Sequence, residues 1–296
     1  MQPFLQQLCI ILAVVLVAPL IGGLLNGVDR ILTARLQGRY GPPLLQPFYD
    51  VIKLIGKERI TVNSTQMLYV ITSLFFAVLS LVMFALRQDL LMIVFVLAFS
   101  HIALIIGAMS VRSPYSKIGA QREIIQMMAY EPVIVLMVVG IYLITGSFMI
   151  DSVYAHPSQL ALRLPLVFLA FLYVLTIKLR KSPFDLSTSH HGHQELIKGL
   201  TTEFSGLQLA VIELTHWYEL VLLLGMITLF FAQPVVVYGI PIWIGGLVAL
   251  GAFVFEIIID NICARTSLAW MLKMTWLAGL GAAVTNIIWL YLATGR

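Results

Sequence analysis

The chain has 296 residues, of which 60% are hydrophobic and only 11% are charged, and its mean hydropathy is +0.97. These values are typical of a polytopic membrane protein, and no segment has the composition of a soluble domain. The two cysteines, Cys9 and Cys263, exclude a disulfide framework and any iron–sulfur cluster or nickel–iron centre held by this chain alone, while the modest net charge of +4 does not indicate nucleic-acid binding.

Eight apolar runs are long enough to cross a bilayer, which requires about 20 residues of helix. We expect them to be helical, because backbone groups in lipid have no water to pair with. The first run has no basic segment before it, so an uncleaved span is expected rather than a signal peptide. The fifth run is the shortest, and Lys178 at its end is expected to snorkel to the interface. The runs lie near residues 5–28, 65–86, 90–111, 132–150, 161–177, 207–232, 235–259 and 274–294.

Basic residues are distributed very unevenly between the loops. Fifteen of the eighteen Lys and Arg residues follow spans one, three, five and seven, whereas Arg87, Arg163 and Arg296 lie on the other side. The positive-inside rule therefore predicts that the basic loops are cytoplasmic and that both termini lie outside. The sequence predicts an all-α polytopic membrane protein, a single membrane domain over residues 1–296 with about eight transmembrane helices. Its cytoplasmic loops are expected at about 29–64, 112–131, 178–206 and 260–273, the first three of them long.

The first long loop is interrupted by Gly41-Pro42-Pro43 and then becomes amphipathic. This pattern predicts a helix lying on the membrane interface, with apolar and basic residues interleaved: Val51, Ile52, Lys53, Leu54, Ile55, Lys57 and Arg59. Because long loops in compact chains are usually functional, a cytoplasmic docking surface is the simplest interpretation. A basic surface helix that only sets the topology explains the same pattern.

The second long loop places two acidic residues shortly before the fourth span. Glu123 and Glu131 are eight residues apart, about two helical turns, so they are able to share one helix face. Glu131 directly precedes Pro132. The alternative is a solvated helix start, where an acidic residue suits the helix dipole.

The segment from Lys178 to Glu219 carries the greatest concentration of ionisable residues at the edge of lipid. It continues into an apolar helix that holds Glu213, His216 and Glu219 at spacings of three, and span seven holds Glu256. Each acidic residue near the centre of a span costs about 2.5–3.5 kcal/mol on insertion scales, so two in one span indicate a purpose beyond folding. We interpret the pattern as proton handling.

Other interpretations of the histidines and of the whole chain stay open. Glu213-x-x-His216 resembles a metal-ligand pair, although a di-metal site needs a second copy. His101 and His216 lie at similar depth and are able to act as axial ligands of a b-type haem, although a buried histidine more often pairs with a polar neighbour. A stand-alone ion carrier and a pure membrane anchor are further alternatives; the absence of an internal repeat weakens the carrier.

At its long loops the chain resembles the junction subunit of respiratory complex I and its relatives in membrane-bound hydrogenases. The matching segments, which follow in family order, are RYGPPLLQPFYDVIKLIGKE, AQREIIQMMAYEP, KSPFDL and QELIKGLTTEFSG. Quinone-reducing members have a longer first loop and an acidic segment where this chain has residues 187–193, which contain no carboxylate. The chain is most similar to the junction subunit of Ech-type energy-converting [NiFe] hydrogenases, followed by the corresponding subunits of formate hydrogenlyase, CO-induced hydrogenase and archaeal membrane-bound hydrogenases.

The resemblance implies a role for each matched residue. Acids of the family motifs are expected to form a proton or coupling path: Glu123, Glu131, Asp185, Glu195 and Glu203. Glu213, His216, Glu219 and Glu256 join this path on membrane burial alone. The docking loops are expected to use Arg39, Asp50, Lys53, His190, His191 and His193, and the three histidines are also candidates for proton uptake.

The resemblance also implies the setting in which the chain works. It is expected to be a non-catalytic membrane subunit of a ferredoxin-dependent hydrogenase complex, in the cell membrane of a bacterium or archaeon. No metal, cofactor or catalytic residue is expected on this chain. The [4Fe-4S] clusters and the [NiFe] centre belong to partners, namely the hydrogenase small and large subunits and a ferredoxin-like iron–sulfur subunit. An antiporter-like membrane subunit is expected to move H⁺ or Na⁺.

Overall fold

The computed structural model describes residues 2–58, 63–157, 159–181, 184, 199–232, 243–264 and 266–294. Within these ranges the chain is helical and its only β-type pairings are two isolated bridges. Among the described residues, seven helices are long and apolar enough to cross a membrane. They are α1 (Gln2–Leu36), α3 (Thr65–Ala85), α4 (Leu90–Met109), α5 (Pro114–Thr145), α9 (Leu207–Leu229), α11 (Trp243–Ile262) and the continuous α12 (Leu268–Met274), η1 (Thr275–Leu280) and α13 (Gly281–Thr294).

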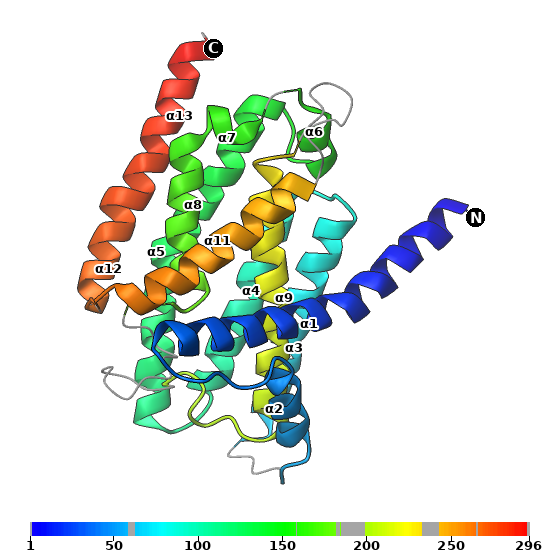
Figure 1. Ribbon diagram of the computed structural model, residues 1–296, viewed down its shortest axis with the longest axis vertical. Helices are drawn as coiled ribbons and strands as arrows, with labels where there is room; N and C mark the ends of the chain where they lie inside the picture. The colour runs from blue at the N-terminus through cyan, green and yellow to red at the C-terminus, as the bar shows by residue number, and fades with distance from the viewer. Residues whose placement is uncertain are drawn as a thin grey trace. The chain divides into compact units, whose positions relative to one another are not determined.

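The expected fifth span is the apolar helix α8 (Pro165–Lys178), which has only 14 residues and therefore a length of about 21 Å. Two short helices, α6 (Ile150–Ala155) and α7 (Leu160–Arg163), precede it. The prediction of an all-α polytopic membrane protein is confirmed. Figure 1 follows the helices in chain order.

The chain divides into two compact units. The first comprises Met1–Leu86, Phe95–Ile125 and Asp185–Leu222, and the second comprises Arg87–Val94, Gln126–Phe184 and Leu223–Arg296. Helix α5 contributes its first part to one unit and the remainder to the other.

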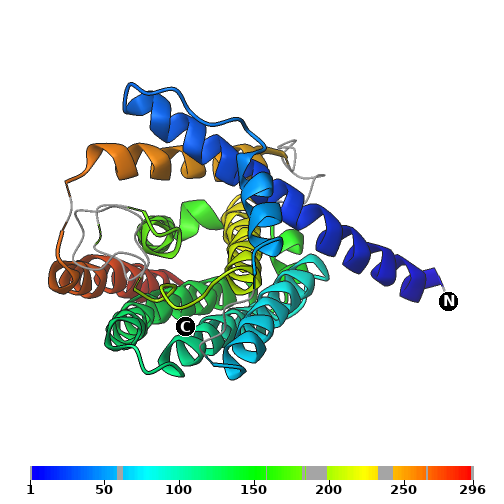
Figure 2. The same ribbon diagram turned by 90° about the horizontal axis from the view of Figure 1, so that it is seen from below.

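In the first unit, α1 packs against α2 (Gln46–Ile55) and α3, as Figures 1 and 2 show. Gly22 lets α1 approach α9 closely, because a Cβ atom at this position would lie 2.6 Å from the Cβ of Trp217. The hydroxyl of Tyr218 donates a hydrogen bond of 2.7 Å to the carbonyl of Val15, and the rings of Phe48 and Trp217 meet edge to face at 5.2 Å. These contacts fix α9 against α1 and α2.

Helix α2 is the amphipathic helix that the first loop predicts. Pro47 stands at its start, where a missing N–H costs nothing. Val51 is buried against Trp217, whereas Ile52 and Ile55 are exposed. One apolar side thus attaches the helix to its unit, and a second apolar side faces outward.

In the second unit, α8 lies beside α13, η1 and α11. A buried side chain of α13 fixes where α8 begins. The Oδ1 atom of Asn286 accepts hydrogen bonds from the backbone N–H groups of Leu166 (2.8 Å) and Val167 (3.2 Å), and its Nδ2 donates to the carbonyl of Arg163 (3.1 Å). Asn286 therefore satisfies polar groups at the end of α7 and at the start of α8, which would otherwise be unpaired in an apolar setting.

Two helices extend beyond the predicted spans. α1 continues to Leu36, into the predicted first loop, and α5 begins at Pro114, so most of the predicted second loop is helical. Glu131 lies in the middle of α5, which continues through Pro132. The alternative that Glu131 marks a solvated helix start is therefore wrong. The beginning of the predicted seventh span, residues 235–242, lies outside the described residues.

Candidate functional site

Parts of the three long predicted loops meet in the first unit. Gly206 adopts φ +50°, and a Cβ atom there would lie 3.2 Å from the carbonyl oxygen of Glu58, at the end of α2. At the start of α5, a Cβ on Gly119 would lie only 2.4 Å from the carbonyl carbon of Gly199. The Nδ2 of Asn63 donates to the carbonyl of Ser110 at 3.1 Å. The third polar segment therefore contacts both the first and the second at these positions, and the first also contacts Ser110, just before the second.

This convergence places two of the predicted acids. Glu203 is half-buried and lies between Gly199 and Gly206, the two ends of the segment that contacts α5 and α2. Glu123, one turn after Gly119 on α5, is buried. Asp185, Glu195, His190, His191 and His193 lie outside the described residues.

Asp50 of α2 binds to α1 through a charged contact. The Nη1 of Arg30 lies 2.6 Å from its Oδ2, Gln46 donates to its Oδ1 at 3.2 Å, and the Nζ of Lys53 is 3.6 Å away. Partial burial of this carboxylate acts to raise its pKa, but the hydrogen bonds from Arg30 and Gln46 and the charges of Arg30 and Lys53 outweigh it and lower the pKa below 3.8. Arg39, by contrast, is exposed and donates a hydrogen bond to Gln37.

The Asp50→Asn variant is expected to be less stable by about 0.5 kcal/mol at neutral pH, because a half-exposed ion pair contributes little. The folded-state pKa is lowered, so the contribution of Asp50 is complete above 3.8 and is lost as the pH falls through the lower folded-state value. Thermal unfolding in detergent at a series of pH values measures this, and the difference between wild type and variant is expected to shrink on acidification. A difference that stays constant across the series would contradict the assignment.

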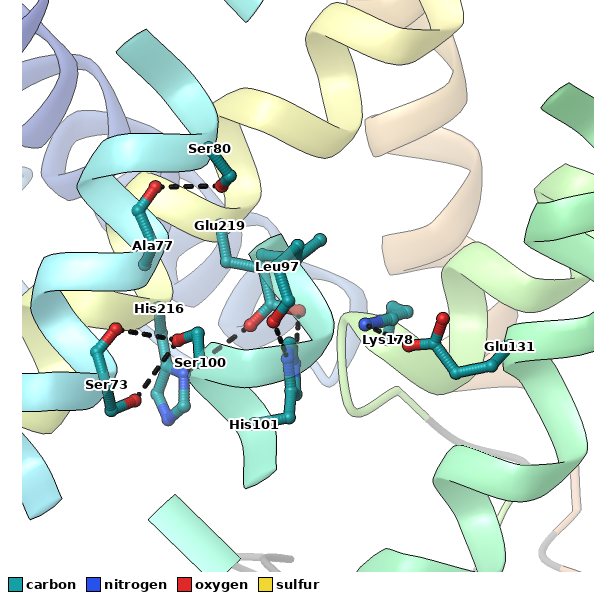
Figure 3. Close-up of polar contacts among 10 residues, drawn as sticks. All are labelled: Ser73, Ala77, Ser80, Leu97, Ser100, His101, Glu131, Lys178, His216 and Glu219. Atoms are coloured by element: carbon teal, nitrogen blue, oxygen red, sulfur yellow. Dashed lines mark hydrogen bonds and ion pairs between the residues drawn. The ribbon is translucent and has the colours of Figure 1, made fainter. Parts of the chain in front are cut away.

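A histidine–glutamate cluster, made of His101, His216 and Glu219, lies in the first unit (Figure 3). The Nε2 of His101 on α4 is 2.8 Å from Oε1 of Glu219 on α9, and the Nδ1 of His101 donates to the carbonyl of Leu97 at 2.9 Å. The Nδ1 of His216 lies 3.8 Å from Oε2 of the same carboxylate. His101 and Glu219 are both buried. Glu213 is half-buried on α9 and makes no hydrogen bond or ion pair with other described residues.

This geometry does not favour the b-type haem. A pair of axial histidines faces one iron from opposite sides, whereas the imidazoles of His101 and His216 converge on one carboxylate. The Nε2 of His101 is already engaged by Glu219. Among the described residues, no group of three or more His, Cys, Asp or Glu side chains is arranged to hold a metal ion.

Two lysine–acid pairs lie in the second unit, Lys178 with Glu131 and Lys181 with Asp260. The side chain of Lys178 is 1% exposed, and its Nζ lies 3.7 Å from Oε1 of Glu131, as Figure 3 shows. The same Nζ sits 4.4 Å from the ring centroid of Tyr130. The expectation that Lys178 snorkels to the interface is therefore wrong, because this ammonium group points into the protein and has a carboxylate and an aromatic face beside it.

The second pair lies at α11, which carries Asp260. The Nζ of Lys181 is 3.7 Å from Oδ2 of Asp260. Glu256, one turn earlier on α11, is 1% exposed, and neither of its carboxylate oxygens has a hydrogen-bond partner among the described residues. Lys181 and Asp260 are the charged groups that act on it. A carboxyl group placed in this way is costly to bury, which is typical of a functional residue in a membrane protein.

Sequence reasoning missed three groups that the structure brings to attention. Neither Lys178 nor Lys181 is assigned an acidic partner by the sequence, yet both pair with acids. On α3, the polar residues Gln66, Ser73 and Ser80 are all buried, and their spacing of seven placed them on one helix face. The amide of Gln66 has no hydrogen-bond partner among the described residues. This seven-residue spacing was the signal that the sequence offered.

Comparison with known proteins identifies the family. A family profile described as NADH dehydrogenase matches residues 8–291. Hydrogenase-4 component C of Escherichia coli is 26% identical over 289 residues, 90% of this chain and 91% of the relative. The related subunit of the NADH-quinone oxidoreductase of Bacillus cytotoxicus is 28% identical over 244 residues, 74% of this chain and 72% of the relative.

A solved structure shares the fold. The matching chain belongs to the membrane-bound sulfane sulfur reductase, an archaeal respiratory membrane complex, and has a TM-score of 0.83 at 24% sequence identity. The alignment covers 98% of this chain and 100% of that one. The apolar helices and the profile match together show that the chain is a multi-pass membrane protein that belongs to the NADH dehydrogenase family of subunits from complex I-like energy-coupling complexes.

Proposed function

We propose that the chain is the membrane coupling subunit of a ferredoxin-dependent, energy-converting [NiFe] hydrogenase. Its three polar segments face the cytoplasm and bind the hydrogenase small and large subunits and the ferredoxin-like iron–sulfur subunit. These partners carry the iron–sulfur clusters and the nickel–iron centre. Its ionisable residues transmit the protonation change to an antiporter-like membrane subunit, which moves H⁺ or Na⁺. Both termini lie on the outer side, by the positive-inside rule.

The observation that carries this proposal is the convergence of the three polar segments at Gly119, Gly199 and Gly206. Polar segments in mutual contact form one continuous surface, which is what a partner protein needs. Glu123 and Glu203 lie at this surface or just beneath it. Reduction of a cluster bound there adds negative charge, and added negative charge favours protonation of nearby carboxylates. Because such groups titrate together, the response belongs to the set of acids rather than to one residue.

The relatives support this assignment. Hydrogenase-4 component C matches nearly the whole chain, and the short first loop and the carboxylate-free residues 187–193 differ from the quinone-reducing pattern. A quinone-reducing complex is the second candidate, because the related subunit of an NADH-quinone oxidoreductase is 28% identical. Purification of the intact complex separates the two: hydrogen evolution from reduced ferredoxin supports the proposal, whereas inhibitor-sensitive quinone reduction favours the second candidate.

The Glu203→Gln variant is expected to lower ferredoxin-driven ion pumping by about tenfold or more, since a positioned acid–base group contributes at least that much to proton transfer. Glutamine keeps the shape of the side chain but cannot release or accept the proton. The measurement is ion uptake into inverted membrane vesicles that contain the assembled complex, with subunit content checked on native gels.

Asp151→Asn is the matched control for Glu203→Gln. Asp151 is exposed at the start of α6 and pairs with Arg87 in the second unit, away from the three polar segments in sequence. Its variant is expected to pump at the wild-type rate. Wild-type pumping by an intact complex with Glu203→Gln would remove Glu203 from the coupling path.

A further inference from the structure

The histidine–glutamate cluster has a feature that the sequence motifs do not contain. His101 lies on α4, outside every family motif, and reaches Glu219 over a separation of 118 residues. Its neighbour Ser100 donates a hydrogen bond of 2.8 Å to the carbonyl of Ser73, which holds this part of α4 against α3. His101 is therefore positioned by packing and by hydrogen bonds on both sides of its ring.

The hydrogen bonds of His101 determine how many protons it shares with Glu219. A carbonyl oxygen only accepts, so the Nδ1 of His101, 2.9 Å from the carbonyl of Leu97, must carry a proton. If no second proton were present, the bare Nε2 would face the bare Oε1 of Glu219 at 2.8 Å, two acceptors in repulsive contact. One further proton must therefore lie between Nε2 and Oε1.

That proton has two positions. On Nε2 it makes an imidazolium beside a carboxylate, and on Oε1 it makes a neutral acid that donates to a neutral imidazole. Movement between them transfers one proton from nitrogen to oxygen and breaks no other bond. The second oxygen, Oε2, is 3.8 Å from the Nδ1 of His216, within ion-pair range and about 1 Å beyond a hydrogen bond. The carboxyl group thus presents one oxygen to each imidazole, as Figure 3 shows.

We propose that His101 is a proton-storage group reached through Glu219 and His216. The relay ends at His101, because the Nδ1–H of His101 donates its hydrogen bond to the main chain of its own helix. A proton that enters from His216 reaches Oε2 of Glu219, and the proton already present moves from Oε1 to Nε2 of His101. His216 is the more accessible member, with 22% of its side chain exposed against 8% for each of the others. Exchange therefore takes place on the His216 side.

The role of this relay in coupling rests on the proposed function, but its protonation state does not. Solid-state ¹⁵N spectra of the ¹⁵N-histidine-labelled holoenzyme measure that state directly. The expected spectrum shows His101 protonated at Nδ1, with Nε2 either protonated or hydrogen-bonded to an acid. The Glu219→Gln variant identifies which ¹⁵N signal belongs to His101, because an amide in place of the carboxyl group changes the hydrogen bond at the Nε2 of His101. An unprotonated Nδ1 on His101 would overturn the proposal whether or not any variant assembles.

The functional arm uses His101→Gln in the assembled complex. Glutamine keeps a polar group but cannot store a proton, so the number of ions pumped per electron is expected to fall, and the rate of ion pumping is expected to fall by about tenfold or more. Redox-difference infrared spectra are expected to lose the carboxylic-acid C=O band of Glu219 in both the His101→Gln and the Glu219→Gln variant. His156→Gln, a histidine between α6 and α7, is the matched control and is expected to leave both readouts unchanged.

The outcomes separate this proposal from the broader one. If Glu203→Gln abolishes pumping but His101→Gln pumps at the wild-type ratio, the storage role is wrong and the proposed function stands. If neither variant affects pumping in an intact complex, the proposed function itself fails. Loss of pumping and of the carboxylic-acid signal in His101→Gln supports storage, because a packing defect alone does not remove a titrating group.

Discussion

Replacing Lys178 with methionine is expected to destabilise the protein by about 3 kcal/mol, the lower end of the range for breaking a buried ion pair. The side chain of Lys178 is 1% exposed and that of Glu131 is 19% exposed, so the remaining carboxylate would be left largely buried without its ammonium partner. Methionine fills a similar volume, which keeps the loss of packing small. The lost contact with the ring of Tyr130 adds to the effect. Thermal or denaturant unfolding in a fixed detergent measures the change.

Two further variants isolate the charge effect. The double variant with Lys178→Met and Glu131→Gln removes both charges, so it is expected to recover much of the loss, and the two changes are expected to be non-additive. Lys273→Met, at an exposed position in the last turn of α12, is the control and is expected to change stability by less than about 0.5 kcal/mol. Equal stability of wild type and Lys178→Met would contradict the buried pair.

The Glu256→Gln variant is expected to slow ion translocation by about 100-fold, the lower bound usual for loss of a positioned acid–base group. Its stability is expected to equal or exceed that of the wild type. Neither carboxylate oxygen of Glu256 has a hydrogen-bond donor among the described residues, so glutamine of the same shape loses no such bond. It also removes a group that is costly to bury as an ion. A residue that reduces stability and is essential for transport is the usual sign of a functional site.

The measurement for Glu256 combines vesicle ion uptake with an unfolding curve for the same preparation. Asp151→Asn, at an exposed position in the same unit as Glu256 and outside the three polar segments, is the control and is expected to leave both unchanged. Unimpaired pumping by Glu256→Gln would exclude Glu256 from the path. A large loss of stability would show instead that its carboxylate has an unrecognised structural partner.

The sequence determined the helices well because the bilayer constrains them. Hydropathy located seven of the helices that are long enough to span a membrane, and also the short α8, since a lipid-exposed backbone has no alternative to the helix. The amphipathic pattern after Gly41-Pro42-Pro43 likewise predicted α2. Hydropathy did not find the true ends of α1 and α5, because both helices continue into polar sequence where packing and partners, rather than lipid, stabilise them.

The site was predictable only in part. Composition marked Glu219, Glu256 and Glu131 as unusual, because acids in apolar runs are costly. It did not identify their partners, since His101 and Glu219 are 118 residues apart and Lys178 and Glu131 lie on different helices. Lys178 was expected to reach the interface because a basic residue at the end of an apolar run usually does so. The structure shows why it does not: Glu131 and Tyr130 offer it an inward position.

The amino-acid sequence by itself determined that this protein is a polytopic helical membrane protein with several acidic residues in and beside its spans, because the cost of polar groups in lipid is a local property of each segment. Only the tertiary structure decided which acids are paired with lysine, which lies against a histidine and which has no hydrogen-bond partner among the described residues. The physical reason is that the protonation behaviour of a buried group depends on the charges and donors within a few ångströms of it. Those neighbours come from helices that are distant in the chain.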